Sequence, residues 1–276
     1  MAELEEKWQE LLETLRATGG ALVAFSGGVD SALLLRAAHE ALGDKVLAVI
    51  ARSPSYPARE YRDAVRLAEL IGAPHRTVET DEVADPEYRK NPPNRCFLCK
   101  STLFRTLAAI AAEQKLPCVL EGSNADDHND YRPGMRAARE LGVRAPLQEL
   151  GLGKAEIREL ARRRGLPVWD KPSLACLSSR IPYGSGITPE RLSRIDQAEE
   201  VLRQRGLRQV RVRDHGDVAR IETDADGMSR LLEPALRSEI SAELKRVGYR
   251  FVSLDLEGYR TGAMNEALEL HASKKG

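Results

Sequence analysis

Hydrophobic residues in the first half of the chain fall into two alternating patterns. Short runs with strand character lie at residues 21–25, 45–51, 76–79 and 118–121. Stretches with helical spacing lie at residues 1–18, 30–42, 57–71, 100–113 and 154–164. Because strands alternate with helices, we predict an α/β domain in which helices cover a parallel sheet.

The second part of the chain has a different order of elements. Its expected elements are a helix at 189–204, alternating strands within 209–223, a helix to about residue 246 and a strand at 250–256. Five proline and glycine residues punctuate residues 166–187, as in a linker between domains. We therefore place a boundary near residue 170. It separates an α/β domain (residues 1–170) from a smaller α+β domain (residues 171–276) for substrate binding or oligomerisation.

The composition indicates a folded protein without a dominant charge. Of the 276 residues, 42% are hydrophobic and 30% are charged, and the 42 basic side chains equal the 42 acidic ones in number. A small anionic substrate fits this balance better than bulk nucleic acid. Residues 1–18 lack the apolar core of a signal peptide, and no apolar run has the length of a membrane span. We therefore expect a cytoplasmic protein without a membrane partner, in which disulfides are not expected.

A glycine-rich segment, SGGVDS at residues 26–31, lies between a predicted strand and a predicted helix. Gly27 and Gly28 let the backbone approach a phosphate, and the amides at the start of the helix attract its charge. Ser26 and Ser31 can add hydroxyl donors, while Asp30 is suited to hold Mg²⁺ beside the phosphates. The alternative is a glycine-rich turn followed by an ordinary helix cap. The position between strand and helix favours phosphate binding.

Three of the four cysteines lie in segments predicted to be loops. Cys96 and Cys99 form a C-x-x-C pair that can bind one metal ion or one edge of an iron–sulfur cluster, and Cys176 can add a third thiolate if the fold brings it near. The alternatives are a structural zinc site completed by His128, unrelated loop thiols, and a Cys176 that surrenders its own sulfur. The last hypothesis leaves the pair without a role, which favours a cluster. Cys118, in an apolar strand, is expected to be a core residue.

The SGGVDS segment resembles the signature of the PP-loop family, whose members cleave ATP between the α and β phosphates. The Walker sequence GxxxxGK[ST] does not occur in the chain, so hydrolysis at the γ-phosphate is not expected. Residues 154–158, KAEIR, are similar to a helix found downstream in this family, although such residues commonly form a solvated helix face. The resemblance implies ATP and Mg²⁺ as cofactors, with AMP and pyrophosphate as products.

Longer segments resemble the LarE family of ATP-dependent sulfur transferases, which make the nickel-pincer nucleotide cofactor of lactate racemase. These segments lie at residues 120–147, 176–184, 210–222 and 254–265. The resemblance implies that a carboxylate of pyridinium-3,5-biscarboxylic acid mononucleotide is adenylated and then converted to a thiocarboxylate. Some members use one sacrificial cysteine, and others hold a [4Fe-4S] cluster on three cysteines. This chain has the three-cysteine pattern, which implies a cluster. The sulfur for the reaction would come from sulfide or from a sulfur-donor protein.

The same resemblance makes several charged residues candidate substrate ligands. Arg211 and Arg213, at alternate positions of a predicted strand, can bind a phosphate or carboxylate through two nitrogens, although such arginines usually form an exposed face. Arg180 and Arg260 are further candidates. Glu199 is expected to be a substrate-site or metal-site carboxylate, with a solvent-facing helix residue as the alternative.

A polar cluster follows the predicted strand at residues 118–121, where open α/β sheets bind ligands. Its members are Asn124, Asp126, Asp127, Asp130 and Arg132. We assign them to the nucleotide or substrate pocket, with a turn of helix-capping residues as the alternative.

Cys176 and Asp30 are thus the predicted catalytic residues of an enzyme expected to be a homo-oligomer. Two other functions stay open at this point. A tRNA thiolase shares the PP-loop and often a three-cysteine cluster, but the neutral charge balance opposes binding to a polyanion. A nucleotide-binding regulator without turnover is the second alternative.

Overall fold

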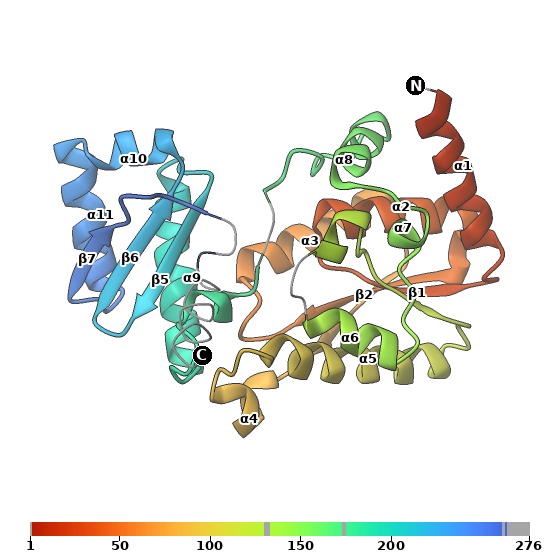
Figure 1. Cartoon of the computed structure of the whole chain (residues 1–276), viewed down its shortest axis with the longest axis horizontal. Helices are drawn as coiled ribbons and strands as arrows, with labels where there is room; N and C mark the ends of the chain where they lie inside the picture. The colour runs from red at the N-terminus through yellow and green to blue at the C-terminus, as the bar shows by residue number, and fades with distance from the viewer. Residues whose placement is uncertain (1, 130–132, 173–174, 261–262, 264–276) are drawn as a thin grey trace, which may run out of the picture. The chain divides into compact units, whose positions relative to one another are not determined.

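The computed structural model describes residues 2–129, 133–172, 175–260 and 263, and the chain forms two compact units (Figure 1). The first unit comprises Met1–Glu82 and Asn94–Leu174. The second unit comprises Val83–Pro93 and Ala175–Gly276. A short segment from the first half of the chain thus belongs to the second unit, and a single boundary near residue 170 does not include it.

The first unit is built on a parallel four-stranded sheet in the order β3-β2-β1-β4. Its strands are β1 (Ala21–Ala24), β2 (Val46–Arg52), β3 (His75–Glu79) and β4 (Val119–Leu120). Leu22 of β1 lies in register with Leu47 of β2 and with Val119 of β4. Apolar runs form the inner strands because helices cover both faces of the sheet, and the predicted α/β architecture is confirmed.

Helices lie on both sides of this sheet (Figure 1). They are α1 (Ala2–Arg16), α2 (Val29–Leu42), α3 (Ala58–Ile71), α5 (Arg95–Glu113), α6 (Pro133–Glu140), α7 (Pro146–Glu149) and α8 (Lys154–Arg163). Ala21 and Val23 of β1 belong to the core shared with α1, α2, α3 and α8. Leu22 belongs to a second core with Phe104 and Leu107 of α5. Successive side chains of β1 therefore point to opposite faces of the sheet and contact different sets of helices.

The helix α5 begins at Arg95, not near residue 100 as the sequence suggested. Proline is excluded from a helix interior, so the helix starts soon after Pro93. Cys96 and Cys99 consequently lie in the first two turns of a helix. The prediction that this pair occupies a loop is wrong.

The second unit contains a three-stranded sheet in the order β5-β6-β7. Its elements are α4 (Pro86–Arg89), α9 (Pro189–Gln204), β5 (Val210–His215), β6 (Val218–Thr223), α10 (Ala225–Leu231), α11 (Pro234–Arg246) and β7 (Phe251–Leu254). The β5–β6 pair is antiparallel and the β6–β7 pair is parallel. Val212 and Ile221 pack with Leu202 of α9 and Leu244 of α11. Side chains next to Val212 and Ile221 along β5 and β6 therefore point to the opposite face of the sheet, away from α9 and α11.

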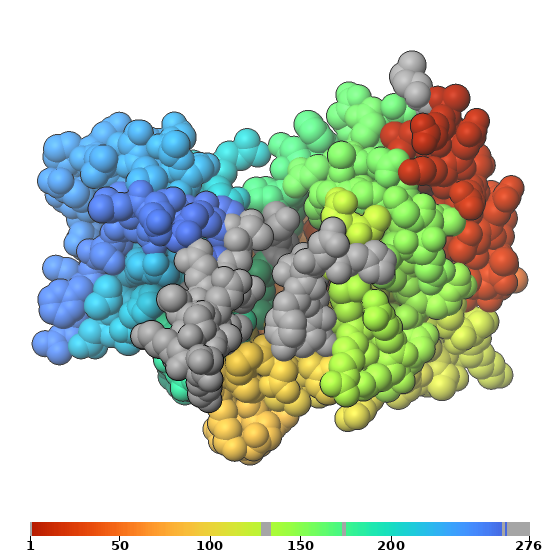
Figure 2. Space-filling model, in the orientation of Figure 1, coloured from red at the N-terminus to blue at the C-terminus, as the bar shows by residue number. Residues whose placement is uncertain are grey.

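Two further features depart from the expected elements. The helix predicted to run to residue 246 is interrupted, because Pro234 is accepted only in the first turn of a helix and so begins α11. The short helix α4 lies at the molecular surface (Figure 2), and only Tyr88 of its four residues is buried.

None of the helices in the described ranges combines the length and apolar character that a membrane span requires.

Candidate functional site

The SGGVDS segment connects the end of β1 to the start of α2 at the carboxyl edge of the parallel sheet. The chain runs from β1 to β2 on one side, while β4 pairs with β1 on the other. A crevice at such a reversal of strand order is where open α/β sheets bind ligands. Gly28 is the N-cap of α2, and no side chain caps this helix end. The first amides of α2 are thus suited to an anion.

Two glycines let the backbone approach closely at this edge. Gly27 has φ +65°, and a Cβ on it would lie 2.8 Å from the Cβ of Ala64 in α3. A Cβ on Gly122, just beyond β4, would lie 2.8 Å from the backbone nitrogen of Ser31. Both contacts are too short for any side chain, so packing requires glycine at both positions, and at Gly27 the backbone conformation also favours it.

The two serines of the loop shape it from within. The Ser26 N–H donates to Ser31 Oγ at 3.3 Å, and the two hydroxyl oxygens lie 3.2 Å apart. The Ser31 hydroxyl also donates to the carbonyl oxygen of Gly28 at 3.1 Å. These hydrogen bonds join the first and last residues of the SGGVDS segment and hold the loop in one conformation.

Asp30 forms an ion pair with a residue that is distant in sequence. Lys154 Nζ lies 2.5 Å from Asp30 Oδ2, and the Asn124 amide donates to Asp30 Oδ1 at 3.5 Å. The backbone N–H of Lys154 donates to Asp126 Oδ2 at 2.7 Å, which fixes the start of α8 beside the loop. Lys154 was missed as a site residue, although the KAEIR segment was the signal that could have identified it.

The other charged residues of that segment hold α8 in place rather than forming a solvated face. Glu156 accepts from the Gly153 N–H at 3.0 Å and pairs with Lys7 of α1 at 2.6 Å. Arg158 donates to the carbonyl oxygens of Trp169 and Lys171 at 3.0 and 2.9 Å. These contacts fix the helix that presents Lys154 to Asp30.

The polar cluster after β4 forms a turn that reaches the phosphate loop. Asp127 Oδ2 accepts from the Asn124 N–H, and Asn124 Oδ1 accepts from the Asp126 N–H, each at 3.0 Å. Asn124 and Asp126 therefore act as turn formers and also contact Asp30 and Lys154. Asp130 and Arg132 lie outside the described residues, as does the side chain of His128.

A second ion pair follows directly after the cysteine pair. Lys100 Nζ lies 2.8 Å from Glu121 Oε2, and the Ser123 hydroxyl donates to Glu121 Oε1 at 2.9 Å. Glu121 is buried at the end of β4. The contact ties the first turns of α5 to the carboxyl edge of the sheet, the edge at which SGGVDS lies.

The three cysteines of the predicted cluster are divided between the units. Cys96 is exposed and Cys99 half-buried on α5 of the first unit, and their spacing puts both thiols on one side of the helix. Cys176 is half-buried and precedes the 3-10 helix η4 (Leu177–Arg180) in the second unit. No disulfide joins the four cysteines, all of which are described. Within the described residues no three His, Cys, Asp or Glu side chains converge as a metal site would require.

The segment that leads into α5 is anchored next to η4 inside the second unit. The hydroxyls of Tyr88 and Ser178 lie 2.7 Å apart, and both are buried. The fully buried Asn91 amide donates to the carbonyl oxygens of Ile181 and Pro182 at 3.1 and 2.8 Å. Residues 83–93 therefore hold the turn that carries Cys176.

Arg180 and Glu199 form a fully buried ion pair in the second unit. The guanidinium binds both carboxylate oxygens, at 2.8 and 3.1 Å, and Arg203 adds a contact at 2.6 Å. Burial opposes ionisation of Glu199, but Arg180, Arg203 and Arg211 outweigh it and lower the pKa of this carboxyl to about 2. Arg180 also donates to the carbonyl oxygen of Cys176 at 3.0 Å. Glu199 is thus not a solvent-facing residue.

The two arginines predicted on one strand face are both buried, each at 5% exposure. Arg213 binds both carboxylate oxygens of Glu222, at 2.9 and 2.6 Å, and donates to the Ser179 carbonyl oxygen at 2.9 Å. Arg211 lies over the Tyr259 ring at 5.2 Å. Burial, followed by repulsion from Arg180, lowers the pKa of Arg211 to about 10. The exposed-face alternative does not describe these arginines.

Arg260 has a different environment from the other predicted arginines. Its side chain is 39% exposed and pairs with Glu257 at 2.5 Å. Arg180 and Arg213 instead meet at Ser179, where one binds the hydroxyl and the other the carbonyl oxygen. The structure therefore gathers Arg180, Arg213 and Glu199 closely around η4 and α9.

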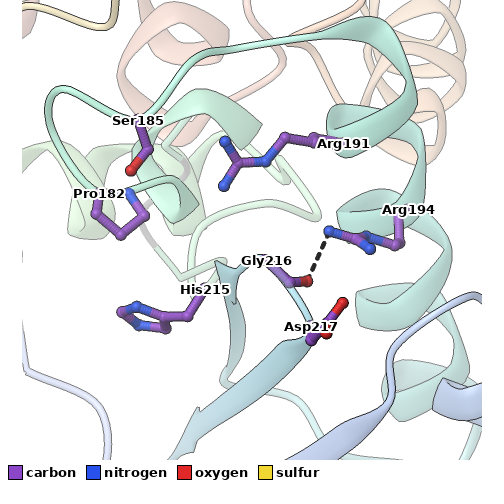
Figure 3. Close-up of a pocket in the computed structure, with 7 residues that line it drawn as sticks. All are labelled: Pro182, Ser185, Arg191, Arg194, His215, Gly216 and Asp217. Atoms are coloured by element: carbon purple, nitrogen blue, oxygen red, sulfur yellow. Dashed lines mark hydrogen bonds between the residues drawn. The ribbon is translucent and has the colours of Figure 1, made fainter.

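An open pocket of about 720 Å³ in the second unit is lined by seven residues other than these (Figure 3). They are Pro182, Ser185, Arg191, Arg194, His215, Gly216 and Asp217. Arg191 and Arg194 bind the buried Asp214 carboxylate at 2.7 and 2.5 Å. They also donate to the carbonyl oxygens of Gly186 and Gly216. These arginines stabilise the unit around Asp214 rather than offering an anion site.

Comparison with known proteins extends the match beyond the loop. Residues 1–92 match the NAD synthase family. The pyridinium-3,5-bisthiocarboxylic acid mononucleotide synthase of Lactiplantibacillus plantarum is 38% identical over 97% of this chain and 97% of its own. An uncharacterised protein of Synechocystis sp. is 43% identical over 96% of this chain and 99% of its own. An uncharacterised protein of Methanocaldococcus jannaschii is 30% identical over 87% of this chain and 90% of its own.

The similarity to the Lactiplantibacillus protein includes both units and not only the nucleotide-binding half. Together with the phosphate loop on a parallel sheet, it shows that this chain belongs to the LarE family of ATP-dependent sulfur transferases, within the PP-loop enzymes.

Proposed function

We propose that this enzyme adenylates a carboxylate of pyridinium-3,5-biscarboxylic acid mononucleotide and replaces one of its oxygens with sulfur. The product would be a thiocarboxylate on the path to the nickel-pincer cofactor of lactate racemase. The substrate class follows from the name of the Lactiplantibacillus relative, and the observation that carries the proposal is the uncapped start of α2 beside the Asp30–Lys154 pair.

Adenylation solves a chemical problem that the carboxylate presents. An oxide ion is a very poor leaving group, whereas AMP leaves readily when a nucleophile attacks the acyl carbon. A substrate carboxylate oxygen attacks the α-phosphorus of ATP, and the bond to pyrophosphate breaks. A sulfur nucleophile then attacks the carbonyl carbon, and AMP departs with the original carboxylate oxygen.

The phosphate loop would stabilise the pyrophosphate as it leaves. The amides that begin α2 and the hydroxyl of Ser26 are donors for an anion at this edge, and the Ser31 hydroxyl would join them by turning from the Gly28 carbonyl oxygen. Lys154 would turn from Asp30 to a phosphate oxygen. Asp30, partly exposed and with hard oxygen donors, fits Mg²⁺, which neutralises phosphate charge when bound.

We further propose that Cys96, Cys99 and Cys176 hold a [4Fe-4S] cluster. Thiolates are its usual ligands, and two of them lie one helical turn apart on α5. Cys176, half-buried before η4, would add the third thiolate. When bound, such a cluster would accept an external sulfide and pass it to the activated carbon, so that its own sulfides are kept.

The buried arginines of the second unit support a site for the anionic substrate. Arg180 and Arg213 have carboxylate partners, Glu199 and Glu222. Arg211 is buried near Arg180 and Glu199, and its planar guanidinium can bind a phosphate or carboxylate through two nitrogens. We propose that Arg180, Arg211 and Arg213 form the anion site, with Glu199 holding the group together and Arg260 reaching the substrate from the more exposed side.

The proposal also includes the sulfur source, the partners, the oligomeric state and the location of the enzyme. Sulfide or a sulfur-donor protein would supply the sulfur, and nucleic acid and membranes would not be partners. A homo-oligomer is supported by β7, the last strand of its described sheet, on which Phe251 is 60% exposed. A cytoplasmic location suits the four cysteines, none of which forms a disulfide.

Anaerobic purification of the wild type and Cys96→Ala, with iron and acid-labile sulfide analysis, tests the cluster. We expect iron in the wild type, little in the variant, and repeated turnovers only in the wild type. A zinc-bound or metal-free wild type that turns over repeatedly would reject the cluster. A single turnover that leaves Cys176 as dehydroalanine would point to sacrificial chemistry.

A further inference from the structure

The side chain of Tyr56 reaches from the loop after β2 to the SGGVDS loop. Its hydroxyl donates to the carbonyl oxygen of Ser26 at 2.7 Å. This carbonyl belongs to the same planar peptide as the Gly27 N–H, and in a trans peptide the two groups point in opposite directions. The contact with Tyr56 therefore fixes the direction of the Gly27 N–H, which points away from the tyrosine.

The loop that carries Tyr56 is itself held firmly. The carboxylate of Glu82 accepts a hydrogen bond from the Ser53 hydroxyl at 2.9 Å and another from the Ser55 hydroxyl. Glu82 and Ser55 are both buried. Pro57, which has a restricted φ, is the N-cap of α3 directly after Tyr56. The tyrosine is thus presented to the phosphate loop from a constrained segment.

The tyrosine also keeps its proton. Burial raises the pKa of Tyr56 well above its usual range, and the nearby carboxylates of Glu60 and Asp63 add to the shift. The phenol therefore remains a hydrogen-bond donor at neutral pH. A carbonyl oxygen needs such a donor if its peptide is to stay in one orientation.

We propose that Tyr56 is a positioning residue for the phosphate loop, which holds the Ser26–Gly27 peptide so that the Gly27 N–H faces the pyrophosphate portion of ATP. A flipped peptide would present the Ser26 carbonyl oxygen to the anion and replace a donor with a repelling dipole. The inference rests on the proposed function, because it requires ATP to bind at this loop.

The test compares full-length Tyr56→Phe with the wild type and with Tyr61→Phe. Tyr61 lies nearby on α3, but its hydroxyl is 3.1 Å from Thr77 Oγ1. Calorimetric titration with inorganic pyrophosphate and, separately, with adenosine distinguishes the two parts of the nucleotide. Tyr56→Phe should bind pyrophosphate roughly fivefold to tenfold more weakly, the usual effect of one hydrogen bond. It should bind adenosine as the wild type does, and Tyr61→Phe should bind both ligands normally.

Thermal unfolding without ligand shows whether a loss of affinity is merely structural. Unchanged pyrophosphate affinity in Tyr56→Phe would overturn the inference. Equal losses for pyrophosphate and adenosine, together with a lower Tm, would also overturn it. Wild-type protein that binds neither pyrophosphate nor ATP would reject the phosphate-binding function itself, and the inference with it.

Discussion

Lys154 Nζ lies 2.5 Å from Asp30 Oδ2, which joins the start of α8 to the start of α2. The two side chains are 30% and 21% exposed, so both are accessible from the carboxyl edge of the sheet. They offer a cation to a phosphate and an anion to Mg²⁺ at one place. In the proposed function, this pair adds to the loop the charges that a nucleotide and Mg²⁺ would need.

Replacement of Lys154 should therefore weaken nucleotide binding. We expect Lys154→Met to bind ATP on the order of 10- to 100-fold more weakly, since a hydrogen bond to a charged group contributes about 1.5–3 kcal/mol. Arg162→Met is the control, because it removes another cation of α8, one that is exposed and pairs with Glu159 at 2.9 Å. Calorimetry should show normal ATP affinity in the control. Equal affinities in all three proteins would remove Lys154 from the site.

The conformation of Gly27 leads to a second prediction. Gly27→Ala should lose most pyrophosphate binding, because the new Cβ would lie 2.8 Å from the Cβ of Ala64 and displace the loop. Gly19→Ala is a suitable control, since Gly19 has a similar φ of +71° but a Cβ added there would meet no atom within 4 Å. Both variants should lose about 1 kcal/mol of stability from backbone strain. Comparable pyrophosphate affinity in the two variants would show that the close packing is not needed.

Local patterns in the sequence predicted the phosphate loop and the sheet that carries it. Apolar runs and the SGGVDS segment depend on neighbours in the chain, so they could be interpreted without a structure. The contact partners of Tyr56 and Lys154 could not be predicted in the same way, although the KAEIR segment pointed to Lys154 itself. Each contact joins residues that the fold brings together, Tyr56 with Ser26 and Lys154 with Asp30.

Local sequence patterns predicted less of the second unit. Alternate arginines on a strand predict an exposed face, yet Arg213 is buried because Glu222 of the neighbouring strand neutralises it. The segment 83–93 joins the second unit through contacts such as that of Tyr88 with Ser178. Those partners are 90 residues apart, and no local pattern predicts such a contact.

The buried Arg180–Glu199 pair predicts a pH-dependent stability. The pKa of Glu199 is lowered from 4.5 to about 2, so its contribution is complete above about pH 4.5 and is lost as the pH falls toward 2. Glu199→Gln, which leaves Arg180 buried without its main counter-charge, should lower the free energy of unfolding by about 3–5 kcal/mol at pH 7. Denaturant unfolding at several pH values should show this difference narrowing below pH 4.5.

The surface pair Arg205–Glu239 provides the comparison. Glu239 is 54% exposed, so Glu239→Gln should cost less than about 1 kcal/mol at neutral pH. A Glu199→Gln effect as small as this, or one that stays constant from pH 7 to pH 3, would contradict the assignment of the low pKa to the ion pair.

The anchoring of the Cys176 turn gives a fourth prediction. Asn91→Ala removes two buried hydrogen bonds, to the carbonyl oxygens of Ile181 and Pro182, and should cost about 1–3 kcal/mol of stability. If the turn supplies the third cluster ligand, the variant should also lose iron while it binds ATP normally. Lys90→Ala, which removes only an exposed pair with Glu87, should keep its iron. Full iron content and full sulfur transfer in Asn91→Ala would show that this anchor is not needed.

In the proposed reaction, a carboxylate is activated as an adenylate before sulfur replaces its oxygen. Mass spectrometry of AMP formed from pyridinium-3,5-biscarboxylic acid mononucleotide labelled with oxygen-18 in its carboxylates tests this directly. We expect one labelled oxygen in the AMP for each thiocarboxylate formed. Thiocarboxylate formation with unlabelled AMP, or without AMP, would contradict it.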